Sequence, residues 1–178
     1  MGNGTSRMRT AILLRAVNLA GNNKISMATL KDLLKRNGYQ DVATYLQSGN
    51  VVASGDVDPR EVEKLIEAEF GSRIDVLTRS HAELEKIVAA NPFPEHAGEG
   101  SKLAVAFCDK APSTSMDKDA YPPDEIIVKG KNIYLWFPGG MGRSKLGLTF
   151  GKKLGVIATV RNWNSVLKLM ELTGTLGR

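Results

Sequence analysis

The order of strand and helix patterns in the first half of the chain is its most restrictive feature. Strand patterns cover residues 10–17, 42–46, 50–54 and 74–78, with helical patterns between the first and second and between the third and fourth. This order, strand, helix, strand, strand, helix, strand, is typical of ferredoxin-like folds, where two helices cover one face of a four-stranded antiparallel sheet. We therefore predict an α+β fold whose first subdomain, residues 10–93 with a connecting helix, is ferredoxin-like and leaves its other sheet face free.

The predicted helices of this subdomain have clear start and stop signals. Ser26 is placed to cap the first helix, which ends at Asn37-Gly38. The second begins at Asp58-Pro59-Arg60-Glu61, where a capping residue precedes a proline at the first helical position. Gly71 ends this helix. A capping box formed by Ser80 and Glu83 opens the connecting helix.

The second subdomain, residues 94–178, is predicted to be a small α+β unit that begins in a segment rich in proline, glycine and charge. Strand patterns at 103–108, 126–128 and 133–137 include a hairpin across residues 129–132. Helical patterns follow at 145–154 and after Thr159, which is placed to cap a final helix. Residues 1–9 are predicted to be a disordered leader, and the sequence shows no internal repeat.

Composition narrows the class of protein without identifying a ligand. The 24 Lys and Arg residues against 19 Asp and Glu give a formal net charge of +5, which favours anionic partners only mildly. One cysteine, Cys108, cannot form an intramolecular disulfide, and two histidines give no zinc-like ligand spacing. No apolar run is long enough to span a membrane. We expect a cytoplasmic protein with no metal, no cofactor and no membrane partner.

Residues 139–145, Gly-Gly-Met-Gly-Arg-Ser-Lys, join a strand pattern to a helical pattern. Their spacing matches neither a Walker phosphate loop nor a dinucleotide-binding loop. Glycines still let backbone N–H groups converge, and a helix N-terminus adds partial positive charge beside Arg143 and Lys145. Anion binding by Arg143, Ser144 and Lys145 is one interpretation, and a plain connection with solvated cations is the other.

Two further arginines are candidates for a ligand site. Arg15 falls within the first strand pattern, on the face opposite Ile12 and Leu14. It could contact a ligand or form an ion pair with a carboxylate of the second subdomain. Arg161 is predicted to lie on the exposed polar face of the final helix, beside Asn162, while Trp163 lies on the buried stripe.

Neutral polar residues complete the candidate site. Four of them lie at predicted strand ends, where they could contact a ligand or simply cap backbone groups: Asn18, Gln47, Ser48 and Asn50. Tyr134 and Trp136 alternate to one face of the late hairpin, where they could stack a base or belong to the core or the subdomain interface.

Three segments taken together resemble a known family: residues 14–21, 44–52 and 158–165, supported by residues 91–93 and 142–146. The chain is similar to the bacterial family called domain of unknown function 1697. The resemblance implies two α+β subdomains, the first ferredoxin-like, and implies no established activity. The chain departs from the family at Ala16 and Ala20, where glycine is usual. The residues that the resemblance picks out are Arg15, Asn18, Gly21, Gln47, Ser48, Gly49, Asn50, Arg143, Ser144, Arg161, Asn162 and Trp163.

The leading functional prediction is a binding protein with a basic cleft between its subdomains, for a phosphorylated small molecule or a nucleic acid. Its charge partners would be Arg15, Arg143, Lys145 and Arg161. One alternative is an enzyme acting on a phosphorylated small molecule, with Ser48 or Ser144 near the chemistry. Another is a protein-interaction module without its own ligand. The sequence identifies no catalytic residue and no oligomeric state.

Overall fold

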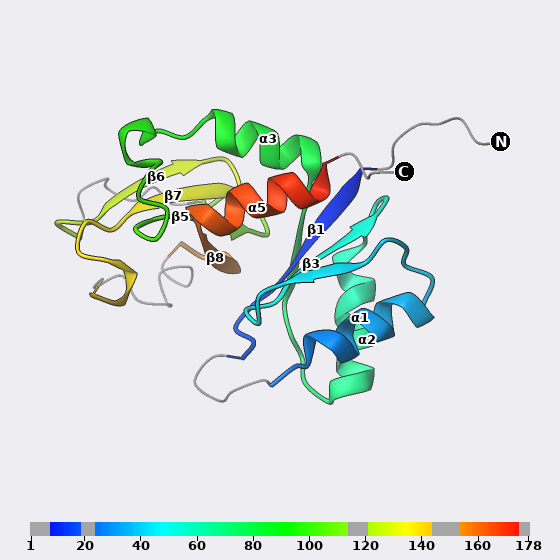
Figure 1. The fold of residues 1–178 in the computed structure, drawn as a ribbon. Helices are drawn as coiled ribbons and strands as arrows, with labels where there is room; N and C mark the ends of the chain where they lie inside the picture. Colours follow the sequence, from blue (N-terminus) through cyan, green and yellow to red (C-terminus); the bar gives the residue numbers. More distant parts are fainter. Residues whose placement is uncertain (1–7, 19–23, 114–120, 144–153, 175–178) are drawn as a thin grey trace. The chain divides into compact units, whose positions relative to one another are not determined.

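The structure, a computed structural model, describes residues 8–18, 24–113, 121–143 and 154–174. It is a mixed α+β fold with two four-stranded antiparallel sheets (Figure 1). Every helix among these residues is too short or too polar to cross a membrane. The described elements are β1 (Arg9–Leu14), α1 (Met27–Arg36), β2 (Ala43–Tyr45), β3 (Asn50–Ser54), α2 (Pro59–Phe70), β4 (Val76–Ser80), α3 (His81–Ala89), η1 (Pro94–His96), β5 (Leu103–Cys108), β6 (Glu125–Lys129), β7 (Asn132–Trp136), η2 (Met141–Arg143), β8 (Ala158–Asn162) and α5 (Trp163–Thr173).

The chain divides into two compact units. The first comprises the described residues up to Glu85 together with those from Leu169 onward, and the second runs from Lys86 to Lys168. Both boundaries fall inside helices, because α3 and α5 each begin in one unit and end in the other. The predicted subdomain boundary at residue 94 remains a prediction.

In the first unit, α1 and α2 cover one face of a sheet with the strand order β2-β3-β1-β4 (Figure 1). Ile12 and Leu14 of β1 belong to one buried cluster with Leu34 of α1 and Ile66 of α2. The helices begin and end where their local signals predict. The Ser26 side chain accepts a hydrogen bond from the Thr29 N–H, and the Asp58 side chain accepts one from the Arg60 N–H. Gly71 ends α2 in the left-handed conformation that glycine adopts without strain.

Two predictions about this sheet are wrong. The first strand ends at Leu14 rather than residue 17, because Ala16 has a φ of 57° and breaks the extended backbone. Arg15 therefore lies just beyond the strand. The face opposite α1 and α2 is not free either, since Ala11, Leu13 and Leu77 are at most 3% exposed. That face therefore offers no open platform on which bases could stack.

In the second unit, the sheet has the strand order β6-β7-β5-β8. Tyr134 and Trp136 of β7 are 1% and 7% exposed, which confirms the interpretation that they belong to the core. The Tyr134 hydroxyl donates a 2.6 Å hydrogen bond to the main-chain oxygen of Ile87 in α3. This bond attaches the end of the connecting helix to the sheet of the second unit.

The segment before the last helix corrects another prediction. Residues 158–162 pair with β5 as β8, and the helix begins only at Trp163. The Asn162 side chain, rather than Thr159, caps it by accepting a 2.9 Å hydrogen bond from the Ser165 N–H. The β-branched pair Thr159-Val160 suits a strand, and pairing with β5 overrides the local capping signal. Arg161 is consequently a strand residue rather than part of a polar helix face.

The two sheets repeat one another in strand order and in register. The first sheet has the order β2-β3-β1-β4 and the second has the order β6-β7-β5-β8, so the four strands of each unit are arranged in the same way. Arg79 of β4 lies opposite Ala11 of β1, and Arg161 of β8 lies opposite Val105 of β5, at corresponding positions of these strands. In both units the last strand continues directly into a helix. The structure thus contains a repeat that the sequence does not show.

Candidate functional site

Two neighbouring loops of the first unit carry most of the unusual backbone in the described chain. One loop, residues 15–18, follows β1, and the other, residues 46–49, joins β2 to β3; together we call them the loop pair. Ala16, Asn18 and Leu46 have φ values of 57°, 56° and 61°, and they are three of the four described non-glycine residues with positive φ. Such conformations cost roughly 1–3 kcal/mol each and concentrate at functional sites. The loop pair is therefore the candidate site.

Asn18 connects the two loops through its side-chain amide. Its Nδ2 donates to the main-chain oxygens of Gln47 at 2.6 Å and Ile25 at 3.0 Å. Its Oδ1 accepts a 2.8 Å hydrogen bond from the Ile25 N–H. Asparagine also tolerates a positive φ better than most residues do. The Asn18 side chain therefore holds the two loops together through hydrogen bonds to main-chain groups.

Gly49 allows the loops to approach each other closely. Its main-chain oxygen accepts a 2.9 Å hydrogen bond from the Leu14 N–H. Its φ is 88°, and a Cβ at this position would lie 2.7 Å from Cγ2 of Val17 and 2.8 Å from Cβ of Leu14. Only glycine satisfies both the backbone conformation and the space.

Asn50 and Ser48 shape the loop between β2 and β3. Asn50 is fully buried at the start of β3. Its Nδ2 donates to the main-chain oxygen of Tyr45 at 2.9 Å and to the Ser48 hydroxyl oxygen at 3.0 Å. The Asn50 side chain is thus committed to the turn, and burial keeps it from direct contact with a ligand in this conformation.

The loop pair presents Ala16, Leu46 and Gln47 to solvent, together with the partly exposed side chain of Arg15. Nη1 of Arg15 lies 3.6 Å from Oδ2 of Asp75, and the Arg15 N–H donates a 2.9 Å hydrogen bond to the Asp75 main-chain oxygen. Both side chains of this ion pair remain partly exposed, at 36% and 45%. Leu46 is 54% exposed and has a φ of 61°, which is uncommon for a residue other than glycine. The site thus offers a cation, an amide and an apolar surface.

Two of the predicted site residues, Arg161 and Asn162, lie at the end of β8 in the second unit. Arg161 is 7% exposed, and its Nη1 donates to the Thr159 hydroxyl oxygen at 2.7 Å and to the Val160 main-chain oxygen at 2.9 Å. Burial lowers the pKa of Arg161 to about 10, so the guanidinium remains cationic at neutral pH. Asn162 is half-buried and caps α5. Both side chains therefore have structural contacts at the end of β8.

Only part of the glycine-rich stretch 139–145 can be placed. The Gly140 N–H donates a 2.8 Å hydrogen bond to the Phe137 main-chain oxygen, and the backbone then enters the short helix η2. Ser144, Lys145 and the side chain of Arg143 lie outside the described residues. Gly21 lies outside them as well. Anion binding by this stretch remains a prediction.

The structure therefore brings together five of the predicted site residues, all in the first unit: Arg15, Asn18, Gln47, Ser48 and Asn50. Sequence reasoning missed Leu46 and Asp75, and noted Ala16 only as a departure from the glycine that is usual in the resembled family. That glycine is the one signal for a positive φ at residue 16, whereas Leu46 has none, and Asp75 reaches Arg15 only because β4 pairs with β1. Among the described residues, no group of three or more His, Cys, Asp or Glu is placed to hold a metal ion.

Comparisons with known proteins agree with this fold and add no activity. The model of a family described as "Protein of unknown function (DUF1697)" matches residues 8–134. The solved structure of the conserved bacterial protein SP0830 from Streptococcus pneumoniae is similar, with a TM-score of 0.65 and 16% sequence identity. The match covers 94% of this chain and 99% of that chain. No curated protein shows significant sequence similarity.

Proposed function

Because the chain belongs to the DUF1697 family, whose description is a protein of unknown function, we propose a function from its own geometry: binding of a small phosphorylated molecule at the loop pair. The observation that carries this proposal is the concentration of positive φ values at Ala16, Asn18 and Leu46. The three hydrogen bonds of Asn18 maintain a conformation that costs free energy. A fold that needed only a connection here could use a less strained backbone.

The chemistry of Arg15 favours a phosphate. A guanidinium matches the oxygens of a phosphate with two parallel hydrogen bonds, and it remains charged at any physiological pH. The present partner of Arg15 is the Asp75 carboxylate, at 3.6 Å and partly exposed. Exposed ion pairs contribute roughly 0–1 kcal/mol, so a dianionic phosphate can displace Asp75 at little cost. The exposed Gln47 side chain, on the neighbouring loop, supplies an amide for hydrogen bonds to the rest of the ligand.

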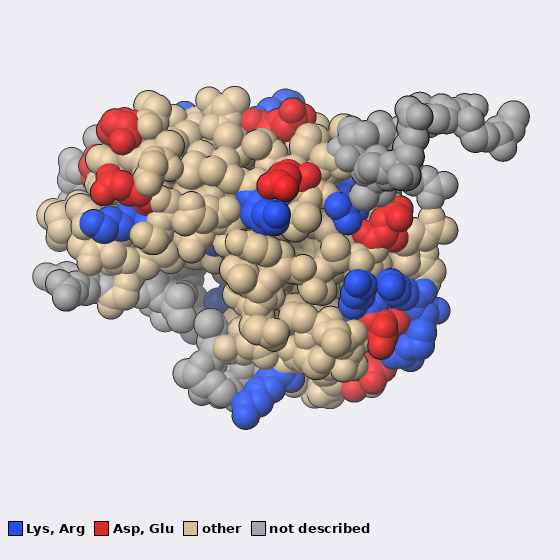
Figure 2. Space-filling view, viewed as in Figure 1, with Lys and Arg blue, Asp and Glu red and all other residues tan. Residues whose placement is uncertain are grey.

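The distribution of charge favours a small ligand over a long nucleic acid. Figure 2 shows isolated or paired basic and acidic side chains over most of the visible face of the described residues, and one larger basic group at the lower right that has acidic side chains beside it. A nucleic acid of many phosphates is instead bound along a continuous basic stripe or groove. The net charge of +5 is modest for that purpose.

The test is a calorimetric titration of the full chain with inorganic phosphate, a panel of nucleoside monophosphates and a single-stranded oligonucleotide, at low and physiological salt. We expect at least one small phosphorylated compound to bind, and its affinity to fall as salt rises. Arg15→Gln is expected to weaken that binding at least about tenfold, because a charge-assisted hydrogen bond contributes about 1.5–3 kcal/mol.

The matched control is Arg36→Gln, which makes the same charge change in the same unit. Arg36 is an exposed arginine of α1 that is ion-paired to Glu69 at 3.2 Å. We expect this variant to bind within about twofold of the wild type, since screening leaves distant surface charges little influence. Equal affinity of the Arg15 and Arg36 variants would refute the proposal. Binding of the oligonucleotide alone would replace it with nucleic-acid binding.

We also propose that the first unit is ferredoxin-like. The element order βαββαβ and the strand order β2-β3-β1-β4 support this assignment. The subdomain limits 10–93 and 94–178, the participation of Arg143, Ser144, Lys145, Arg161 and Asn162, the cytoplasmic location, and the enzyme and interaction-module alternatives remain predictions.

A further inference from the structure

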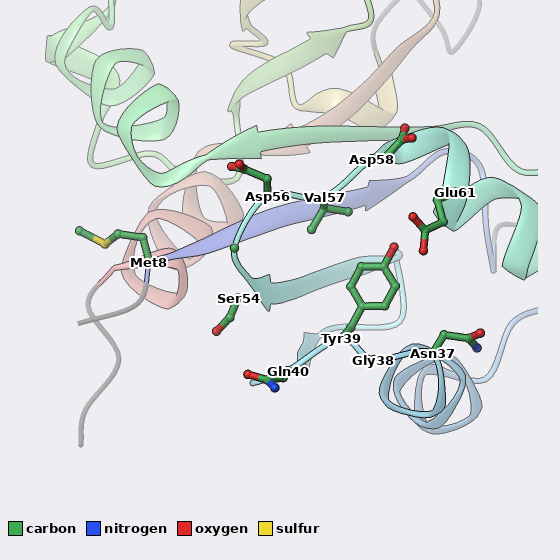
Figure 3. Close-up of a pocket in the computed structure, with 11 residues that line it drawn as sticks. Met8, Asn37, Gly38, Tyr39, Gln40, Ser54, Asp56, Val57, Asp58 and Glu61 are labelled. Carbon is green, nitrogen blue, oxygen red and sulfur yellow. The ribbon is translucent and has the colours of Figure 1, made fainter. Parts of the chain in front are cut away.

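A pocket of about 900 Å³ opens at the other end of the first unit's sheet from the loop pair. Its walls come from three places: the residue before β1, the segment after α1, and the stretch from the last residue of β3 to the first turn of α2 (Figure 3). We call it the Tyr39 pocket. Its lining residues are Met8, Asn37, Gly38, Tyr39, Gln40, Ser54, Gly55, Asp56, Val57, Asp58 and Glu61. None of these residues takes part in the loop pair.

The lining has a single sign of charge. Asp56, Asp58 and Glu61 are acidic, and none of the other lining residues is Lys, Arg or His. Asp58 has a structural task, because it caps α2. Asp56 has none, since its side chain is exposed and makes no hydrogen bond or ion pair with the described residues. The pocket therefore holds at least one carboxylate that the fold does not use.

The second unit shows that this place in the fold does not require acidic residues. β7 begins 82 residues after β3, and β8 begins 82 residues after β4. By the same offset, Gly140 stands where Asp58 stands in the first unit, and Arg143 stands where Glu61 stands. At these two sequence positions the first repeat thus carries two acidic residues, and the second carries glycine and a cation. The fold therefore does not require acidic residues at these positions, and their charge is a property of the pocket.

The carboxylates do not form a metal site. Among the described residues, no three His, Cys, Asp or Glu side chains lie close enough to hold one ion. Charges spread around a cavity suit a ligand that is larger than an ion and reaches them from inside. The apolar parts of the wall, Met8 and the half-buried Val57, suit a ligand with an apolar body.

Tyr39 gives the pocket an aromatic wall beside a carboxylate. Figure 3 shows its hydroxyl directed toward Glu61. Burial first, and then the charge of Glu61 and the hydrogen bond to it, raise the pKa of Tyr39 to about 12. The hydroxyl therefore stays protonated and leaves the pocket's negative charge to the carboxylates. An aromatic ring also attracts a cation over its face.

We propose that the Tyr39 pocket binds a small organic cation, with one ammonium or guanidinium group on an apolar body. The cationic group pairs with Glu61 beside Tyr39, and the apolar body lies against Tyr39 and Val57. The charge of Asp56, on the other side of the pocket, adds a longer-range attraction. This site is separate from the loop pair and takes a ligand of opposite charge, so the two proposals stand or fall independently.

The test uses benzylamine, which is protonated at neutral pH, and benzyl alcohol as its neutral counterpart. Each is titrated into the isotopically labelled full chain at low salt, and amide chemical shifts are recorded. We expect benzylamine to shift the amides of residues 39 and 56–58 with a dissociation constant of about 1 mM, which is ordinary for so small a ligand. Benzyl alcohol is expected to bind at least about tenfold more weakly, because it lacks the charge.

Variants separate the pocket from general surface charge. Glu61→Gln removes the direct partner of the ammonium group and should weaken benzylamine binding about fivefold to tenfold. Asp56→Asn changes an exposed loop residue, should leave folding intact, and should weaken binding about threefold, because its charge acts from across the pocket. Asp32→Asn, the same charge change on the exposed surface of α1, should have less than a twofold effect. Equal binding of benzylamine and benzyl alcohol, no binding of benzylamine, or equal effects of the Asp56 and Asp32 variants would overturn the proposal. Arg15→Gln should leave benzylamine binding unchanged whatever its effect on phosphates.

Discussion

The side-chain amide of Asn18 donates a 2.6 Å hydrogen bond to the main-chain oxygen of Gln47, although the residues are 29 positions apart in the chain. Together with two hydrogen bonds to Ile25, this contact holds the loop after β1 against the loop before β3. The strained conformation of the loop pair thus depends on a half-buried side chain whose hydrogen bonds are made to main-chain groups.

Replacing Asn18 by alanine should therefore destabilise the first unit. Three hydrogen bonds at roughly 1 kcal/mol each predict a loss of about 2–3 kcal/mol in the free energy of unfolding. Urea unfolding followed by far-UV circular dichroism measures this loss. Asn37→Ala is the control, since the Asn37 side chain donates one hydrogen bond, to Leu33. A loss for Asn18→Ala no larger than the control's would contradict this account of the loop pair.

Replacing Ala16 by glycine should act in the opposite direction. Ala16 is exposed and has a φ of 57°, a conformation that glycine adopts without a Cβ penalty. The relief of strain exceeds the added entropy of the unfolded chain, so we expect a gain of about 0.5–1 kcal/mol. Phosphate-ligand affinity should change little if Ala16 only shapes the loop. A loss of stability in the same urea experiment would show that Ala16 is not strained.

Gly49→Ala tests the close approach between the loops. The added Cβ would meet Val17 at 2.7 Å and Leu14 at 2.8 Å, and both contacts involve buried atoms with little room to move. We expect a loss of about 3 kcal/mol or more from strain and overpacking together. Gly38→Ala separates these causes, because Gly38 has a similar φ of 91° but nothing within 4 Å of its added Cβ. That variant should lose only about 1 kcal/mol. Similar losses in the two variants would remove the steric argument.

Local chemistry made much of the fold predictable from the sequence. The second helix could be placed because Asp58, Pro59 and Gly71 act within a few residues of the backbone groups that they cap or terminate. The strand β8 could not be predicted in this way, because Thr159 is equally suited to cap a helix and to pair in a strand. Its pairing with β5 depends on a partner more than 50 residues away.

The candidate site was predictable only in part, for a related reason. The sequence identified four polar residues of the site: Asn18, Gln47, Ser48 and Asn50. It did not show whether their side chains contact a ligand or cap backbone groups. The hydrogen bonds of Asn18 and Asn50 show that these two hold the backbone. The strain at Leu46 has no sequence signal, because it arises from the closure of the loop against its neighbour. The Tyr39 pocket was missed because its walls come from segments whose residues show no common motif.

Tyr134 offers a test in the second unit, with a defined dependence on pH. Its hydroxyl is buried and donates to the Ile87 main-chain oxygen, and burial raises the pKa of Tyr134 to about 12 from its usual 10. Between pH 10 and 12 the unfolded state releases this proton while the folded state keeps it. The free energy of unfolding should therefore fall by roughly 1.4 kcal/mol per pH unit across that range, a contribution fully retained below pH 10.

Tyr134→Phe removes both the hydrogen bond and the titration. Below pH 10 the variant should be less stable by about 1–2 kcal/mol, because the Ile87 carbonyl loses its donor. Above pH 10 the wild type loses stability that the variant keeps, so their unfolding free energies should converge and cross near pH 11. Urea unfolding followed by tryptophan fluorescence reports on this unit, since Trp136 and Trp163 both belong to it. A constant difference between wild type and variant from pH 8 to 11.5 would show that burial does not hold the Tyr134 proton.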